Sequence, residues 1–359
     1  MLDIRDFYKG KRVLITGHTG FKGSWMSELL LGCEASVTGY ALRGEAGSLF
    51  EILGLDKTDN LNNVYADIRD IASLSAAFEK YKPEIVIHMA AQPIVRTSYK
   101  EPVYTYETNV MGTVNVLECI RNSSCVKSFV NVTTDKVYKN YERDEGYTED
   151  EYLCGYDPYS NSKSCSELVT DSYRNSFLND KGVAVSTIRA GNVVGGGDYA
   201  PERIIPDCVR AATSGKDIIV RNPASVRPYQ HVLEPIVMYL YIAAMQYMNK
   251  DYAGAYNIGP DETDAITTGE MATAFCNEWN RISDKKVGWI NKSDGGPHEA
   301  TYLKLNCDKA KATFDWNPLW HIDDTMVRIV EWYSACDCGA DMVEVTREQI
   351  REYLEAFYE

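Results

Sequence analysis

Short runs of β-branched and apolar residues alternate with longer amphipathic segments over the first half of the chain. The apolar runs fall at residues 13–16, 35–40, 63–66, 85–90, 128–133 and 184–188. Between them apolar residues recur at helical spacing, as at Val114, Leu117 and Ile120. Apolar strands joined by helical crossovers indicate a parallel sheet that is covered on both faces. The pattern therefore predicts a doubly wound α/β domain of the Rossmann type over residues 1–190.

Beyond residue 190 the pattern becomes less regular, with frequent Gly and Pro between short segments. We expect later helices near residues 232–249, 267–280, 322–335 and 345–357. They alternate with brief strands, such as the one at residues 255–258. The interpretation is a smaller mixed α/β substrate lobe. It would comprise residues 191–229 and 259–359, with a segment of about 230–258 returning to the first domain.

Charge and composition limit the possible partners. The chain has 359 residues with 37 basic and 52 acidic side chains, a formal net charge of −15. This balance argues against binding to nucleic acid or to an anionic membrane, because both depend on Lys and Arg. No apolar stretch reaches the roughly 18 residues of a membrane span, and the ten cysteines include no CxxC pair. We expect a cytoplasmic protein with reduced cysteines and no metal site.

A glycine-rich turn follows the first predicted strand, with Gly17, Gly20 and Gly23 at three-residue spacing. Such a turn lets the backbone approach a pyrophosphate at a helix N-terminus; three glycines in isolation would be compatible with a simple tight turn. Asp67 and Ile68 follow the third strand, where the carboxylate can accept from an adenine amino group or simply cap the strand end.

A Tyr and a Lys four residues apart, Tyr159 and Lys163, share one face of a predicted helix. A phenol with a pKa near ~10 is a weak base at neutral pH, but a neighbouring ammonium favours the phenolate. An exposed Tyr and Lys on a helix surface is the alternative for this pair alone. Thr133 and Thr134 end the strand before it and place a hydroxyl nearby.

Together these motifs resemble the extended short-chain dehydrogenase/reductase family over nearly the whole chain. The resemblance implies that Thr134 hydrogen-bonds the reacting oxygen, that Tyr159 is the base, and that Lys163 holds the nicotinamide ribose and lowers the Tyr pKa. The implied cofactor-binding residues are Gly17, Thr19, Gly20, Phe21, Lys22, Gly23, Arg43, Asp67, Ile68, Ala90, Ala91, Gln92, Asn109, Thr133, Tyr159 and Lys163.

The tripeptide Thr134-Asp135-Lys136 resembles the nucleotide-sugar 4,6-dehydratase branch of that family. Removing water across C5 and C6 of a hexose needs one group to protonate the leaving hydroxyl and another to take the C5 proton. Asp135 and Lys136 are the candidates for this pair. Dehydratases of dTDP- and GDP-sugars typically have Glu in the third position, and the Lys resembles the enzymes that act on CDP-glucose. The branch implies a role in the biosynthesis of deoxysugars for O-antigen-type polysaccharides, including lipopolysaccharide.

Several alternatives remain open at this stage. The chain could be a 4-epimerase or reductase of the same family, a dehydratase of another nucleotide hexose, or a non-catalytic binding protein on the same fold. Asp135 and Lys136 could also belong to an exposed charged loop. The intact set of Thr134, Tyr159 and Lys163 argues against a non-catalytic protein.

The resemblance also implies ligand contacts and an assembly. Residues 201–231 contain five basic and three acidic side chains, which suits a substrate diphosphate. The implied substrate-binding residues are Gln92, Arg96, Asn192, Arg203, Arg221, Arg227 and His298. NAD is the expected cofactor, although Arg43 after the second strand could meet the 2′-phosphate of NADP. We expect a homodimer or higher homo-oligomer that forms through helices at about 102–122 and 159–178.

Overall fold

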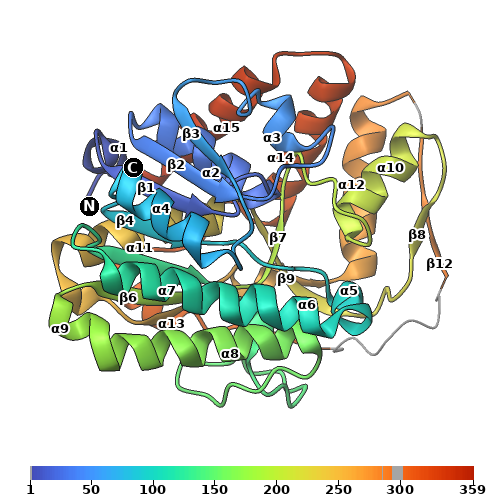
Figure 1. The fold of residues 1–359 in the computed structure, drawn as a ribbon. Coiled ribbons are helices and arrows are strands. Elements are labelled where there is room, and N and C mark those ends of the chain that lie inside the picture. Colours follow the sequence, from blue (N-terminus) through green and yellow to red (C-terminus); the bar gives the residue numbers. More distant parts are fainter. Residues whose placement is uncertain (1, 285, 293–301) are drawn as a thin grey trace.

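The computed structural model, which describes residues 2–284, 286–292 and 302–359, is built around a seven-stranded parallel sheet with the strand order β10-β6-β5-β4-β1-β2-β3 (Figure 1). The strands are β1 (Arg12–Thr16), β2 (Ser36–Ala41), β3 (Leu61–Tyr65), β4 (Ile85–His88), β5 (Ser128–Val132), β6 (Ala184–Ala190) and β10 (Ala255–Ile258). From β1 the chain proceeds to β2 and β3, and then returns to the other side of β1 at β4. The predicted doubly wound α/β fold is confirmed.

The sheet separates two apolar layers because alternate side chains of each strand point to opposite faces. Leu14, Val86 and Phe129 belong to one buried cluster, whereas Val13 and Ile15 belong to the other. The first layer is covered by α4 (Ile71–Tyr81), α7 (Gly112–Asn122) and α8 (Pro158–Tyr173), and the second by α2 (Phe21–Gly32), α11 (Leu233–Met248) and α15 (Met342–Tyr358).

Helix α11 lies between the sheet and the short helix α1 (Ile4–Tyr8) and contacts both β5 and β6. Its side chains are buried almost all round, which explains why this segment is apolar at nearly every position rather than amphipathic. The Tyr8 hydroxyl donates to the carbonyl oxygen of Leu240, so α1 is fixed across this helix. Helix α11 thus packs against the larger sheet, and the assignment of residues 230–258 to the first domain stays a prediction.

The smaller part of the molecule lies beside the carboxyl ends of the strands (Figure 1). It contains a three-stranded sheet and a two-stranded sheet, with β7 (Asn192–Val194), β9 (Val226–His231) and β11 (Ala265–Thr267) in the first, and β8 (Ile218–Val220) and β12 (Trp289–Asn291) in the second. Its helices are α10 (Ile204–Thr213) and α12 (Thr268–Ile282). A capping box between Thr267 and Glu270 fixes the start of α12.

The last third of the chain contributes to both parts. Helix α14 (Ile322–Asp337) contacts α12, while α15 packs against α2 and α13 (Asp308–Phe314) packs against β10. An ion pair between Arg347 and the buried Glu28 links α15 to α2. Residues 259–359 thus include segments that lie against the larger sheet, and the proposed division into two domains stays a prediction.

The remaining helical elements are short. They are α3 (Leu49–Ile52), α5 (Val95–Lys100), α6 (Pro102–Tyr106), a π-helical turn at Glu107–Met111, a 3-10 turn at Asp135–Val137, a π-helical turn at Arg174–Leu178, α9 (Asn179–Lys181), and 3-10 turns at Lys250–Tyr252 and Glu262–Asp264. Within the described residues, no helix combines the length and the apolar character needed to cross a bilayer.

The predicted strands occur in the structure, with ends that shift by one or two residues. The fourth strand ends at His88 rather than at Ala90, because the backbone N–H groups of Met89 and Ala90 both turn to the Thr16 hydroxyl, each at 3.1 Å. This turn places the chain after β4 directly beside the end of β1. It is the switch point at which open α/β sheets bind ligands.

Candidate active site

A cavity of about 1260 Å³ opens at the carboxyl ends of β4, β5 and β6 and is closed on its other side by the smaller lobe. The side chains of Thr134, Asp135, Lys136, Tyr159 and Lys163 all line it. The structure therefore brings the five predicted catalytic residues together. It also places Phe21, Lys22, Ala91, Arg96, Thr133, Asn192, Arg203, Arg221 and Arg227 in the lining.

The glycine turn between β1 and α2 is shaped by close backbone contacts. Gly17 has a φ of +79°, and a Cβ there would lie 2.8 Å from the Ala90 nitrogen. A Cβ on Gly23 would lie 2.2 Å from the Gly17 carbonyl oxygen. No side chain caps the N-terminus of α2, which leaves its first N–H groups for an anion. These residues fit the diphosphate of a dinucleotide.

His18 follows Gly17 and points into the protein rather than outward. Its ring occupies the space above Gly39, where a Cβ would clash with it, and Nε2 lies 2.9 Å from the Asn63 amide oxygen. Burial lowers the pKa of His18 to about 4, so the ring is neutral at neutral pH. Its Nδ1 is buried with no hydrogen-bond partner among the described residues. No motif in the sequence predicted this buried position for His18.

The predicted adenosine end is formed by residues outside the cavity lining. The Asp67 carboxylate accepts from the backbone and side chain of Arg69, and this bonding lowers its pKa. The Arg43 guanidinium lies over the Tyr65 ring, 4.3 Å from its centroid. Both groups therefore have protein partners already. Their roles toward adenine and the ribose stay predictions.

The side chains of Asn109 and Gln92 link the loop after β4 to the neighbouring helices. The Asn109 amide lies in a π-helical turn, accepts from the Gln92 backbone nitrogen at 2.8 Å and donates to Ser162 on α8 at 2.9 Å. The Gln92 amide donates to Thr105 and accepts from the Ile94 nitrogen. Both residues are buried and neither lines the cavity. In this arrangement they position the loop after β4, and direct ligand contact stays a prediction.

Helix α8 places Tyr159 and Lys163 on the face toward the cavity. Asp157 caps its N-terminus by accepting from the Ser160 nitrogen, and Pro158 occupies the first turn. The Lys163 ammonium donates to the Val132 carbonyl oxygen at 3.1 Å, and burial lowers its pKa to about 8. Burial raises the pKa of Tyr159 to about 12, opposed by its contact with Thr134. With a pKa of about 12, the Tyr159 phenol keeps its proton at neutral pH unless further positive charge is brought beside it.

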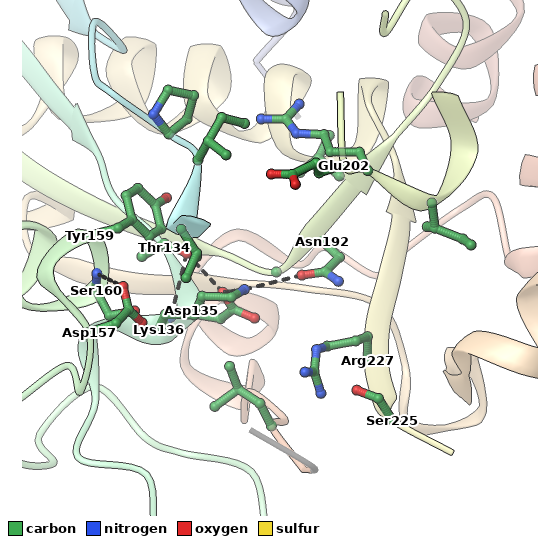
Figure 2. A pocket seen from close by; sticks show the side chains of 18 of the residues that line it. Thr134, Asp135, Lys136, Asp157, Tyr159, Ser160, Asn192, Glu202, Ser225 and Arg227 are labelled. Atoms are coloured by element: carbon green, nitrogen blue, oxygen red, sulfur yellow. Dashed lines mark hydrogen bonds and ion pairs between the residues drawn. The ribbon is translucent and has the colours of Figure 1, made fainter. Parts of the chain in front are cut away.

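A 3-10 turn at Asp135–Val137 brings the side chains of Thr134, Asp135 and Lys136 together (Figure 2). Oδ1 of the fully buried Asp135 accepts from the Thr134 hydroxyl at 2.8 Å and lies 3.0 Å from the Lys136 ammonium. Its Oδ2 is buried without a hydrogen-bond partner among the described residues. Lys136 also donates to the Asn192 amide oxygen at 3.3 Å. The two predicted dehydration groups thus form one ion pair, and the exposed-loop alternative is wrong.

Three of the predicted substrate arginines, Arg203, Arg221 and Arg227, lie on the side of the cavity formed by the smaller lobe, whereas Arg96 lies on α5. Several of the four are paired with carboxylates. Arg203 lies 3.0 Å from Asp198, and Arg96 and Arg221 lie 3.7 and 4.0 Å from Glu202. Figure 2 shows Glu202 across the cavity from the Asp135–Lys136 pair. His298 lies outside the described residues. A diphosphate entering here would compete with these carboxylates for the guanidinium groups.

Several residues of the site were missing from the sequence-based predictions. Asp198, Glu202 and Ser225 line the cavity, and no sequence motif assigned a role to any of them. Tyr239 lies within the apolar segment that forms α11 and was indistinguishable there from a core residue.

The strand order, the glycine turn and the Tyr159–Lys163 pair define the class as an extended short-chain dehydrogenase/reductase. The profile of the family described as GDP-mannose 4,6 dehydratase matches residues 14–329, and the chain belongs to this family.

Comparisons with individual proteins agree with this assignment. The chain is 45% identical over 363 residues to "CDP-glucose 4,6-dehydratase" of Salmonella typhimurium, which covers 99% of each chain. It is 25% identical to "dTDP-glucose 4,6-dehydratase" of the same organism, covering 90% of this chain and 93% of the relative. The fold matches the crystal structure of dTDP-glucose 4,6-dehydratase from Bacillus anthracis in complex with NAD, with a TM-score of 0.75, 23% identity, and coverage of 93% of this chain and 100% of that one.

Proposed function

We propose that the chain is a CDP-glucose 4,6-dehydratase, a hydro-lyase that converts CDP-glucose to CDP-4-keto-6-deoxyglucose with loss of water. The observation that carries the proposal is the ion pair of Asp135 and Lys136, 3.0 Å apart in the cavity that also contains Tyr159. Epimerases and reductases of the same fold need the Tyr but have no use for this pair. The 45% identity to a CDP-glucose 4,6-dehydratase over nearly the full length supports the choice of substrate.

We propose NAD as the resident cofactor. Gly17, Gly20 and Gly23 would lie against its diphosphate, and Lys163 would hold the nicotinamide ribose. When bound, NAD supplies reversible hydride chemistry between C4 and C6 of the sugar. The contact of Arg43 with Tyr65 supports NAD over NADP, because a guanidinium that stacks on an aromatic ring is less free to meet a 2′-phosphate. Fluorescence titration with both nucleotides tests this, and tighter NADP binding would reverse the choice.

The chain's own residues carry out the proton transfers. Tyr159 as phenolate takes the proton of the 4-hydroxyl while Thr134 hydrogen-bonds the same oxygen, and the resulting 4-keto group makes the C5 proton acidic. The reactive form of the Asp135–Lys136 pair has its proton on Oδ2 of the carboxyl group and a neutral amine on Lys136, which is the same number of protons as in the ion pair. Lys136 then takes the C5 proton, and Oδ2 of Asp135, which has no partner among the described residues, protonates the departing 6-hydroxyl. The pair ends with the same number of protons with which it began. The product also needs a proton at C5, and this return balances the proton that Tyr159 took from the 4-hydroxyl, so that Tyr159 ends as the phenolate again.

The substrate diphosphate and cytosine would lie toward the smaller lobe, where Arg203, Arg221 and Arg227 line the cavity, and Arg96 lines it from α5. Asn192 joins this group in the sequence-based prediction, and its contact with Lys136 supports an additional role in holding the catalytic amine. The product would serve deoxysugar biosynthesis for O-antigen-type polysaccharides.

A homodimer is part of the proposal. Val103 on α6, Met111 in the adjoining π-helical turn and Leu168 on α8 are 69%, 52% and 56% exposed. These large apolar side chains lie on the two helical segments predicted to form the interface, and burial against a second copy would remove them from water. Light scattering of the purified chain measures the assembly directly, and a monomer at micromolar concentration would contradict it.

The experiment that tests the function is a mass-spectrometric screen of CDP-, dTDP-, GDP- and UDP-hexoses incubated with the protein and NAD. The proposal predicts loss of one water from CDP-glucose at the highest rate. Conversion of a substrate to an isomer of the same mass would indicate an epimerase. Water loss from another nucleotide sugar at a higher rate would retain the dehydratase and reject the CDP assignment.

A further inference from the structure

Lys22 places a cation in the cavity that the mechanism above does not use. It is the second residue of α2, is partly buried, and lines the same cavity as Tyr159 and Lys163. Its Nζ lies over the ring of Tyr239, 5.8 Å from the centroid, and no hydrogen bond or ion pair to the described residues satisfies it. An ammonium group without a polar partner in such a place is costly unless a ligand supplies one.

Tyr239 gives a second, independent indication of a ligand at this point. It lies on α11, is fully buried, and its hydroxyl has no hydrogen-bond partner among the described residues. Buried hydroxyls in proteins are nearly always paired. A fully buried hydroxyl and a neighbouring ammonium thus both have no polar partner among the described residues, and Lys22 is the one of the two that lines the cavity.

The neighbours of Lys22 indicate which part of a ligand would lie there. Burial and the charges of Lys163 and Arg203 lower the pKa of Lys22 to about 7, while Asp135 acts in the opposite direction. Lys163 and Asp135 are predicted catalytic residues, so Lys22 lies at the part of the cavity where the reaction would take place. Gly17, Gly20 and Gly23, which would hold the cofactor diphosphate, do not line the cavity, whereas Lys22 does.

We propose that Lys22, whose ammonium lies over the ring of Tyr239, contacts the nicotinamide end of the bound cofactor, and that its positive charge favours the reduced nicotinamide over the oxidised one. The inference rests on the proposed function, which places the nicotinamide beside Tyr159 and Lys163. Oxidised nicotinamide carries a positive charge and reduced nicotinamide does not, so a nearby ammonium repels only the first. Such a residue promotes removal of hydride from the sugar at the start of the reaction.

The test compares the dissociation constants of NAD+ and NADH for the full-length protein freed of bound nucleotide. NADH is measured by its fluorescence and NAD+ by competition, without any sugar substrate. The proposal predicts that the ratio of the NAD+ constant to the NADH constant falls on the order of tenfold in Lys22→Met, which is the size of a one-unit pKa effect. Lys22→Arg should keep the ratio of the original protein, because it keeps the charge.

ADP-ribose provides the matched probe and Lys139→Met the matched variant. ADP-ribose has the diphosphate without the nicotinamide, so its affinity should be unchanged in Lys22→Met. Lys139 is an exposed lysine that also lines the cavity, and its replacement should leave the ratio unchanged. Equal weakening of NAD+, NADH and ADP-ribose in Lys22→Met would show a diphosphate contact and overturn the proposal. An unchanged ratio with unchanged affinities would overturn it as well.

The dependence of the ratio on pH gives a second readout. In the original protein the ratio should fall as pH rises from 6 to 9, as Lys22 loses its charge, and this part of the change should be absent in Lys22→Met. The other titratable or charged groups that act on Lys22 or on Tyr239 are Lys163, Arg203, Asp135 and Tyr159. They are present in both proteins, so the difference between the two profiles belongs to Lys22. Failure of the dehydratase assignment would leave these binding measurements intact.

Discussion

The ammonium of Lys136 lies 3.0 Å from Oδ1 of Asp135, although the two residues are neighbours in sequence. In an extended strand their side chains would point to opposite faces. The 3-10 turn at Asp135–Val137 brings them together, directly after β5. Because Oδ1 also accepts from Thr134, the other carboxylate oxygen is left for the substrate.

Replacement of Lys136 by Ala should stop the reaction after hydride has left C4. We expect kcat for water loss to fall by about 10²–10⁴, the usual contribution of a general acid or base. The absorbance of reduced nicotinamide should then accumulate when CDP-glucose is added. Lys139→Ala, at the exposed lysine of the same cavity, is the control and should dehydrate normally. A normal rate of water loss in Lys136→Ala would remove Lys136 from its role.

Asn192 offers a way to separate positioning of the catalytic amine from binding of the diphosphate. Its amide oxygen accepts from Lys136 at 3.3 Å. We expect Asn192→Ala to lower kcat by roughly tenfold with a smaller change in KM, because one hydrogen bond to a charged group is lost. Steady-state kinetics with CDP-glucose measures the split. A rise in KM at unchanged kcat would assign Asn192 to the diphosphate alone.

The catalytic helix depends on a buried ion pair. Glu167 lies one further turn along α8 from Lys163, and its carboxylate makes two bonds to Arg189 of β6, at 2.9 and 3.0 Å. Both side chains are less than 5% exposed. We expect Glu167→Gln to lower the free energy of unfolding by about 3–5 kcal/mol, because it leaves the arginine buried without a counter-charge.

Urea denaturation measures this effect. Glu348 and Arg351 form an exposed pair on α15, and Glu348→Gln should change the free energy of unfolding by about 1 kcal/mol or less. A double variant, Glu167→Leu with Arg189→Met, should be more stable than Glu167→Leu alone. Equal loss in the buried and exposed single variants would contradict the assigned importance of the buried pair.

Glu234 predicts a specific dependence of stability on pH. Burial raises the pKa of its carboxyl from 4.5 to about 7, although it accepts from the Trp320 nitrogen and the Tyr353 hydroxyl. The folded protein therefore keeps a proton that the unfolded chain loses between pH 4.5 and 7. This contribution to the free energy of unfolding is fully present below pH 4.5 and declines as pH rises through that window.

Glu234→Gln removes this titration. Relative to the original protein, the variant should gain on the order of 3 kcal/mol in the free energy of unfolding between pH 4 and pH 8. Chemical denaturation at the two pH values gives the comparison. A constant difference between the two proteins would show that Glu234 is ionised throughout.

The sheet could be predicted from the sequence because its strands are continuous apolar runs, as at residues 85–88 and 128–132. Such short runs between helical segments are typical of strands that are buried on both faces of a parallel sheet. The sequence also predicted which residue types meet at the site because Thr134, Tyr159 and Lys163 follow or flank those strands. It did not predict the partners, since these depend on long-range packing. The contact of Lys136 with Asn192 joins residues 56 positions apart. Tyr239 contacts Lys22 from a helix whose apolar sequence indicates only core residues.

The fate of the hydrogen at C4 of the substrate tests the proposed dehydratase most directly. CDP-glucose labelled with deuterium at C4 should give CDP-4-keto-6-deoxyglucose that retains the label at C6, because the same hydride is removed and returned within one cavity. Mass spectrometry and proton NMR of the product locate the label. Retention at C6 is the predicted result, and loss of the label to solvent, or its retention at C4, would contradict the proposed dehydratase.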